Sequence, residues 1–123
     1  MANELTVTAS ILDNLVSQAI GVTALNVSQS ANPPRSVRSR QVVTLSEAAL
    51  ALGVLTGATL GWCVIINLDA VNFMEVRVGT GSTKFCKIKA GEVACFRFGS
   101  GITAPYVIAD TASVEIYSCV WEA

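Results

Sequence analysis

The chain has 123 residues, of which 52% are apolar and only 14% are charged, against a usual charged share of about 25%. Its net charge of −1 argues against binding nucleic acid through a basic surface, and the absence of histidine removes the commonest general base and zinc ligand. The length predicts one domain, with a core large enough to fold without disulfides or metal ions. A mean hydropathy of +0.56 is high for so small a domain, so we expect surplus apolar surface in a protein interface or a membrane.

The four cysteines, Cys63, Cys86, Cys95 and Cys119, form no C-x-x-C pair, and each lies in an apolar run. Without histidine to complete a ligand set, no zinc site is expected, and we predict small core residues instead. The start of the chain lacks the positive segment of a secretory signal. We therefore expect reduced thiols, in a protein made in a cytoplasm.

Hydrophobic alternation predicts β-strands in the first part of the chain. Residues 4–12 alternate apolar and polar side chains, residues 22–28 do so again, and residues 41–45 are short and β-branched. A weak helix-start pattern at residues 46–50 predicts a single helical turn.

Residues 30–40 predict a Pro/Arg-rich loop, because proline cannot donate to a strand ladder. The residues that define it are Pro33, Pro34, Arg35, Arg38 and Arg40. The simplest interpretation is a solvated loop. The functional alternative is an arm that docks on an acidic neighbouring subunit, because guanidinium groups pair well with carboxylates.

Residues 48–66 contain no charge and have the length of a membrane span. Gly53, Gly57 and Gly61 lie four apart, the small-residue spacing of packed membrane helices. A small membrane protein is therefore one alternative. Glycine and threonine dilute the hydrophobicity, however, and the residues that follow alternate as strands do, so we favour a protein without a membrane span.

From Gly61 onward, short runs bounded by turn residues predict further strands at 62–68, 73–78, 84–88, 93–98, 106–109 and 113–121. The first run is apolar at successive positions, which is typical of a central strand. In the second, Met74, Val76 and Val78 are expected to face inward. About eight short strands in all predict an all-β, antiparallel, jelly-roll-like β-sandwich, formed as a single domain over residues 1–123.

No motif predicts catalysis, a cofactor or a metal site. Serine and threonine lack a histidine to activate them, and no spacing favours a lysine base. Asp69, Glu92 and Asp110 lie in predicted turns, where carboxylates cap their own backbone. The aromatic residues Trp62, Trp121, Phe73, Tyr106 and Tyr117 are expected mostly to pack in the core, although exposed ones would mark an interface or a sugar-stacking platform.

Several short segments in a fixed order suggest a family. They are Ser46-Glu47-x-Ala49-Leu50-x-Leu52-Gly53, Gly61-Trp62, Asn67-Leu68-Asp69, Asn72-Phe73-x-Glu75-Val76, Lys89-Ala90-Gly91-Glu92 and Ala109-Asp110-Thr111-Ala112. In this order and spacing, residues 46–123 resemble small structural proteins encoded among the virion genes of tailed bacteriophages.

The resemblance implies a non-enzymatic jelly-roll component of the virion, assembled in the host cytoplasm. A capsid decoration or cement protein is expected first: a homo-oligomer that binds the major capsid protein, or another virion protein, and stabilises the head shell. A fibre or tail-associated carbohydrate-binding module is the alternative. The arginine-rich segment would contact the neighbouring subunit, and no nucleic acid or membrane partner is expected.

Overall fold

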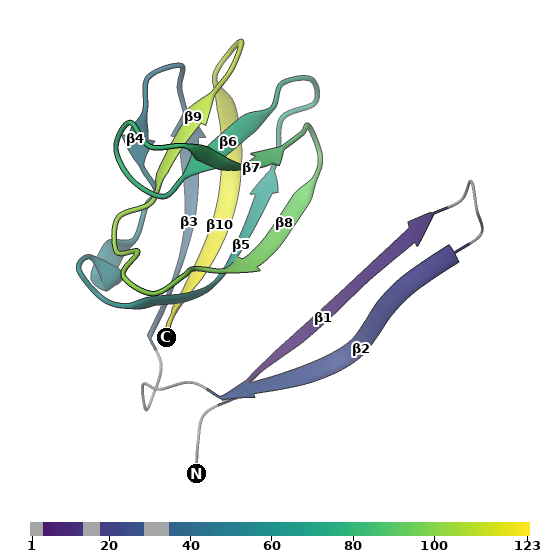
Figure 1. The fold of residues 1–123 in the computed structure, drawn as a ribbon. Coiled ribbons are helices and arrows are strands. Elements are labelled where there is room, and N and C mark those ends of the chain that lie inside the picture. Colours follow the sequence, from purple (N-terminus) through teal and green to yellow (C-terminus); the bar gives the residue numbers. More distant parts are fainter. Residues whose placement is uncertain (1–3, 14–17, 29–34) are drawn as a thin grey trace. The chain divides into compact units, whose positions relative to one another are not determined.

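The computed structural model describes the backbone of residues 4–13 and 18–28 and the complete residues 35–123 (Figure 1). The chain divides into two compact units, Met1–Pro34 and Arg35–Ala123. In the first unit, β1 (Glu4–Asp13) and β2 (Gln18–Ser28) form a two-stranded antiparallel sheet. Leu5 pairs with Val27 and Ile11 with Ile20, and the register shifts once between Val7 and Ala9.

The second unit is a sandwich of two four-stranded antiparallel sheets. Its strands are β3 (Ser36–Val43), β4 (Ala48–Ala49), β5 (Leu60–Asn67), β6 (Met74–Arg77), β7 (Lys84–Ile88), β8 (Val93–Arg97), β9 (Tyr106–Ala109) and β10 (Val114–Glu122), with a short 3-10 helix, η1 (Gly53–Leu55). One sheet has the order β3-β10-β5-β8 and the other β4-β9-β6-β7. Successive strands alternate between the sheets except at the β6–β7 hairpin, which is the strand order of a jelly roll.

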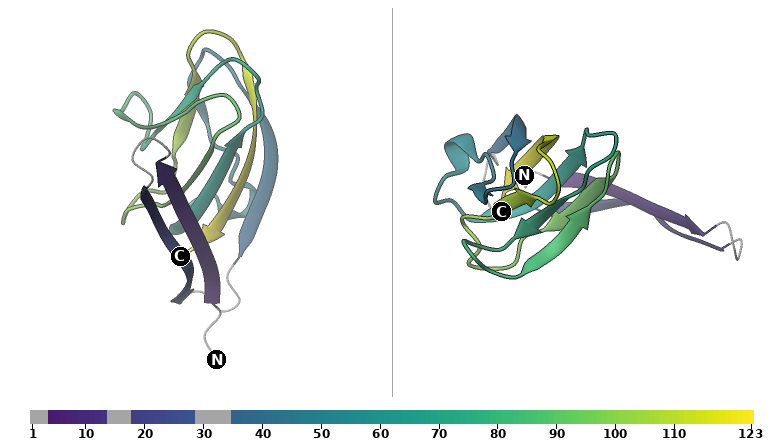
Figure 2. Two further views of the ribbon diagram at one scale, coloured as in Figure 1. Left: turned by 90° about the vertical axis from the view of Figure 1, so that its right-hand side faces the viewer. Right: turned by 90° about the horizontal axis from the view of Figure 1, so that it is seen from above.

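The core lies between the two sheets, because each strand directs every second side chain inward. On β5, Cys63 and Ile65 are fully buried, while Trp62, Val64 and Ile66 keep partial exposure. Met74 and Val76 of β6 meet them from the other sheet, both fully buried. Figure 2 shows the two layers from the side and from above.

Asn67 is a polar residue in this core, and its side chain is fully satisfied. The amide nitrogen donates to the carbonyl oxygens of Asn72, at 2.9 Å, and Ile88, at 3.1 Å. Its side-chain oxygen accepts from the Asp69 N–H at 2.9 Å. A buried amide with these partners costs little and fixes the β5–β6 turn relative to β7.

The predicted all-β, jelly-roll-like sandwich is confirmed, and each predicted strand from residue 62 onward overlaps an observed one. The boundaries of the predicted domain change, since the sandwich occupies residues 36–122 rather than 1–123, and β1 and β2 form a sheet of their own. The predicted loop over residues 30–40 was wrong for its second half. Residues 36–40 belong to β3, where they pair with β10.

Two smaller expectations also change. The helical turn predicted at residues 46–50 is instead the two-residue strand β4, held by β9. Val78 was expected to face inward and is 41% exposed just beyond the end of β6. Within the described parts of the chain, no helix is long and apolar enough to cross a membrane, and residues 48–66 fold as β4, η1 and β5.

Candidate docking surface

The outer face of the β3-β10-β5-β8 sheet gathers apolar and aromatic side chains. We call it the docking face, and the alternation of the strands and their register define its members. They are Ser36, Arg38, Arg40 and Val42 on β3, Glu115, Tyr117, Cys119 and Trp121 on β10, Trp62, Val64 and Ile66 on β5, and Val93, Cys95 and Arg97 on β8.

The centre of the docking face is apolar from strand to strand. Val64 of β5 pairs with Cys119 on one side and with Cys95 on the other, and Ile66 lies between Tyr117 and Val93. Val93 is 60% exposed at the β8 edge. Outward-facing positions on an antiparallel sheet are ordinarily polar, so this composition makes the face a candidate docking surface.

Trp62 adds a polar atom without a partner to this face. Its indole Nε1 is shielded from solvent and makes no hydrogen bond among the described residues. A buried donor left unpaired costs roughly 1–3 kcal/mol.

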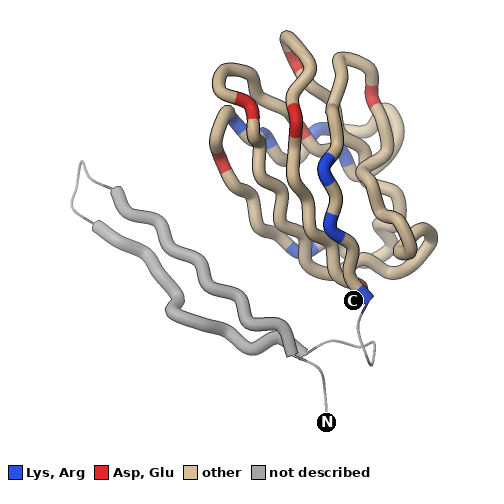
Figure 3. The backbone as a smooth tube through the Cα atoms, turned by 180° about the vertical axis from the view of Figure 1, so that it is seen from behind, with Lys and Arg blue, Asp and Glu red and all other residues tan. Residues whose placement is uncertain are grey.

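The charges of the docking face lie around its apolar centre (Figure 3). Arg38 and Arg40 lie on the edge strand β3, and Arg97 lies at the end of the opposite edge strand, β8. The Arg40 side chain donates from Nε to Glu115 Oε1 at 2.8 Å. In the described part of the chain, neither Arg38 nor Arg97 makes an ion pair, so both remain available to a carboxylate of a partner.

Arg35, predicted to contact a neighbouring subunit, is committed within its own chain. Its guanidinium donates from Nε to Glu122 Oε2 at 2.9 Å and from Nη2 to Glu122 Oε1 at 2.6 Å. A third nitrogen, Nη1, donates to the Val54 carbonyl at 3.3 Å. The Arg35 guanidinium holds the pKa of the Glu122 carboxyl below its usual range. Pro33 and Pro34 lie outside the described residues.

The structure therefore separates the predicted interface residues. Arg38 and Arg40 face outward from β3, whereas Arg35 lies just before β3 and is hydrogen-bonded to the end of β10. The core position expected for most of these aromatic residues was wrong, since all five are only half-buried. Trp62, Tyr117 and Trp121 lie on the docking face, and the apolar run of β5 did not reveal which of its faces is the core.

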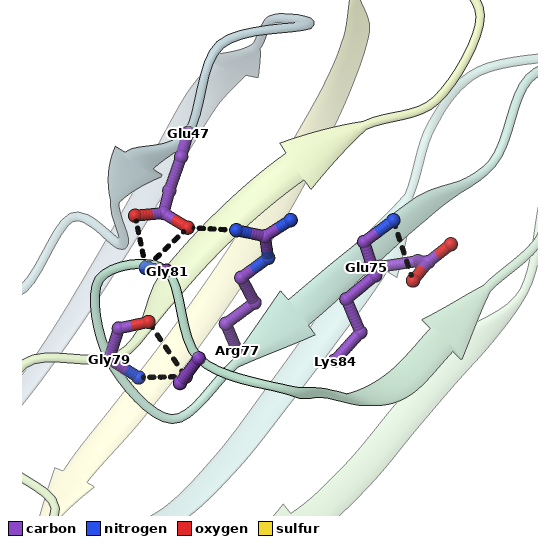
Figure 4. Close-up of polar contacts among 7 residues, drawn as sticks. Glu47, Glu75, Arg77, Gly79, Gly81 and Lys84 are labelled. Carbon is purple, nitrogen blue, oxygen red and sulfur yellow. Dashed lines mark hydrogen bonds and ion pairs between the residues drawn. The ribbon is translucent and has the colours of Figure 1, made fainter.

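The outer side of the β4-β9-β6-β7 sheet is held by charge pairs (Figure 4). Glu47, just before β4, accepts a hydrogen bond from Arg77 Nη1 and accepts the Gly81 N–H at 2.9 Å. Glu75 on β6 pairs with Lys84 on β7 at 3.5 Å. The Glu47 contacts hold the β6–β7 turn against the residue just before β4. Sequence reasoning did not single out Glu47, because its partners lie 30 or more residues away.

Ligand chemistry has little support among the described residues. No group of three metal-ligating side chains lies together in residues 35–123 or elsewhere in the described chain. All four cysteines are free. Burial raises the pKa of the Cys63 thiol well above its usual range, which keeps it protonated and unreactive.

Comparisons with known proteins identify no family. No protein-family model matches the chain, and no curated protein matches it. Among solved structures, it is similar to a chain of the Bacillus endospore appendages, described as a novel family of disulfide-linked pili, at 14% identity and a TM-score of 0.49, with 80% of this chain and 98% of that chain covered. It is also similar to a Salmonella typhimurium LT2 structure assigned to ethanolamine utilization protein Q, at 10% identity and a TM-score of 0.42, with 98% of each chain covered. Similarities this low do not bear on function.

Proposed function

We propose that this protein is a structural component of a virion, a decoration or cement protein that binds the major capsid protein of a phage head through its docking face. The observation that carries the proposal is the apolar outer face of the β3-β10-β5-β8 sheet, framed by arginines. The resemblance of residues 46–123 to phage virion proteins supports it independently. In this role the protein stabilises the shell after assembly in the host cytoplasm.

Binding would draw on two kinds of contact. The apolar centre loses water on docking, at a gross ~25 cal/mol per Å² less the cost of ordering both partners. Aromatic anchors such as Trp62 and Tyr117 lie nearest that centre, where interface residues contribute most. Arg38 and Arg97, at the rim, would pair with carboxylates of the capsid subunit and set the orientation.

Many weak contacts are sufficient for such a protein. A shell presents the same binding site at every symmetry-related position, so a decorating oligomer engages several sites at once. The affinity of each site can then be modest while the whole coat stays bound. A surface with an apolar centre and few charges suits weak binding at many sites.

The experiment is co-sedimentation with empty shells assembled from the major capsid protein of the virus that carries this gene. We expect the parent chain to sediment with the shells and Val64→Lys to lose at least tenfold in affinity, because the new ammonium group would be desolvated at the centre of the contact. Ile108→Lys is the matched control, since Ile108 is also half-buried and aliphatic, on a central strand of the other sheet. Equal binding by the two variants would contradict a role for the docking face.

A carbohydrate-binding module of a fibre or tail is the second candidate. The observation that favours it is the presence of Trp62, Tyr117 and Trp121 on one sheet face, where aromatic rings can stack on sugars. Sugar sites also use asparagine and aspartate side chains, and the docking face contains neither. Glycan-array binding that is abolished by Trp121→Ala, together with no binding to shells, would favour this candidate over the first.

A further inference from the structure

Within residues 35–123, β8 pairs with no strand beyond β5, and its open edge is unlike the three other sheet edges of the sandwich. Each sheet ends in two edge strands, β3 and β8 in one and β4 and β7 in the other. Edge strands carry unpaired N–H and C=O groups, and proteins protect them with charges or by keeping them short. β3 carries Arg38 and Arg40, β7 carries Lys84 and Lys87, and β4 has only two residues.

β8 has neither protection along most of its length. Residues 93–96 read Val-Ala-Cys-Phe, and the only charge on the strand is Arg97 at its end. The surface beside this edge is also apolar. Phe85 of β7 meets Phe96 edge to face, with 5.3 Å between ring centroids, and remains 47% exposed.

The register with β5 shows which backbone groups of β8 are free. The Asn67 N–H donates to the Glu92 carbonyl, and the Phe98 N–H donates to the Gly61 carbonyl, both at 3.0 Å. In an antiparallel ladder, alternate residues direct both groups to the same side. The even-numbered residues thus bond β5, and Val93, Cys95 and Arg97 direct their N–H and C=O groups to the open edge.

We propose that β8 pairs with β8 of a second copy, antiparallel and about a two-fold axis at Cys95. Among the symmetric registers, this one pairs all five residues of the strand, and it forms about six interchain hydrogen bonds from the three free residues of each copy. Val93 lies opposite Arg97 of the second copy.

The charge at the end of β8 favours this direction. Arg97 is the only charged residue of the strand. Antiparallel pairing about Cys95 places the two Arg97 side chains at opposite ends of the paired strands, whereas parallel pairing in register would place these like charges together.

The pairing would make one eight-stranded sheet and join two docking faces into a single surface. The proposed β8–β8 pairing does not depend on the identity of a capsid partner. A five-residue edge buries much less than the ~800 Å² per partner of a standard interface, so we expect a weak dimer in dilute solution that strengthens where copies are held close together.

The first test is cross-linking of the purified full-length chain with a short thiol-to-thiol bismaleimide. Paired at Cys95, the two Cys95 side chains lie on the same face about 5.5 Å apart. Burial raises the pKa of the Cys95 thiol, so the reaction is run at mildly alkaline pH. We expect a covalent dimer from the parent and from Cys86→Ser, and none from Cys95→Ser. A dimer that persists in Cys95→Ser, or no dimer from the parent, would overturn the proposal.

The second test separates specific pairing from random collision. Val93→Lys adds a charge to the open edge and keeps Cys95, and we expect it to lower both the cross-linking yield and the dimer affinity in sedimentation equilibrium at least tenfold. Val71→Lys, at a position 82% exposed in the β5–β6 turn, should behave as the parent. Cross-linking of Val93→Lys at the parental yield would refute the edge pairing. A chain that dimerises but does not bind shells would retain this inference and remove the proposed function.

Discussion

The two outer faces of the sandwich have opposite chemistry, although their sheets have the same number of strands and share one core. The β4-β9-β6-β7 sheet carries Glu75, Arg77, Lys84 and Lys87 outside, and most of their charge is neutralised within the chain. The docking face carries tryptophan, valine, isoleucine and cysteine at its centre, and among residues 35–123 Arg38 and Arg97 have no carboxylate partner.

This difference distinguishes the side-chain positions that form the core from those that only form the surface. The core is satisfied by the inward positions alone, so the outward positions of either sheet are free to vary. One sheet uses them for ion pairs that fasten its own turns. The other uses them for apolar surface, and this is why we propose that a partner binds that side.

The largest expected effect compares two neighbouring residues of β5. Ile65 is fully buried, whereas Val64 faces outward. We expect Ile65→Ala to lower the free energy of unfolding by about 3 kcal/mol, because it leaves a cavity in the core. Val64→Ala should cost about 1 kcal/mol or less. Urea denaturation measures both, and equal losses would show that the outer face is as necessary to folding as the core.

The next effect compares one ion pair from each face. Glu47 and Arg77 are mostly buried, with side chains 16% and 19% exposed, whereas Arg40 and Glu115 are 63% and 46% exposed. Removing Glu47 leaves a charged donor and the Gly81 N–H unpaired, so we expect Glu47→Ala to cost about 2 kcal/mol. Glu115→Ala should cost less than about 1 kcal/mol. The prediction fails if thermal unfolding ranks the two variants in the reverse order.

A smaller effect concerns two glycines at the ends of the two sheets. A Cβ at Gly61 would lie 3.1 Å from the Ala123 Cα and 3.2 Å from the Trp121 oxygen, both main-chain atoms. Gly61→Ala must therefore separate β5 from the end of β10, at a cost of about 1.5 kcal/mol. Nothing lies within 4 Å of a Cβ at Gly79, so Gly79→Ala should be neutral or slightly stabilising. Comparable destabilisation of both variants would exclude close approach at Gly61 as the cause.

The smallest effect is a pH dependence at the end of β10. The Arg35 guanidinium depresses the pKa of Glu122 in the folded chain, so the ionised pair stabilises the fold above the unfolded pKa of about 4.3. That contribution is lost as the pH falls through the lower folded pKa. We expect Glu122→Gln to reduce the shift in urea midpoint between about pH 6 and about pH 3. Arg35→Gln should reduce it equally, and an unchanged shift in either variant would mean that the pair does not act on stability.

The sequence predicts the fold well where alternation is strong. Residues 74–77 and 84–88 show their pattern locally, and those strands were placed almost to the residue. The start of β3 was missed because only Val37 is apolar among its first five residues, as is common for an edge strand. Local pattern cannot show that Ser36 pairs with Trp121, across 85 residues.

The candidate site was predicted only in part. Arg38 and Arg40 were singled out, but as loop residues, and the docking face itself was not foreseen. Residues 62–66 are apolar at consecutive positions, so their composition fits either face as the core. The pairing of β5 with its neighbours determines which face packs in the core, with Trp62 on the outside and Cys63 on the inside. The high mean hydropathy did indicate an apolar surface, without its location.

The sandwich begins and ends at one place, and this has a mechanical consequence. β3 and β10 are antiparallel neighbours, Ser36 pairs with Trp121, and the Glu122 N–H donates to the Arg35 carbonyl at 2.8 Å. A tensile load applied between Arg35 and Ala123 would therefore separate β3 from β10 one residue pair at a time, rather than load all of their hydrogen bonds together. The bidentate Arg35–Glu122 ion pair lies beside the first residue pair to separate. We expect the unit to open at low force when it is pulled by its ends, and to resist far better when load enters through its faces.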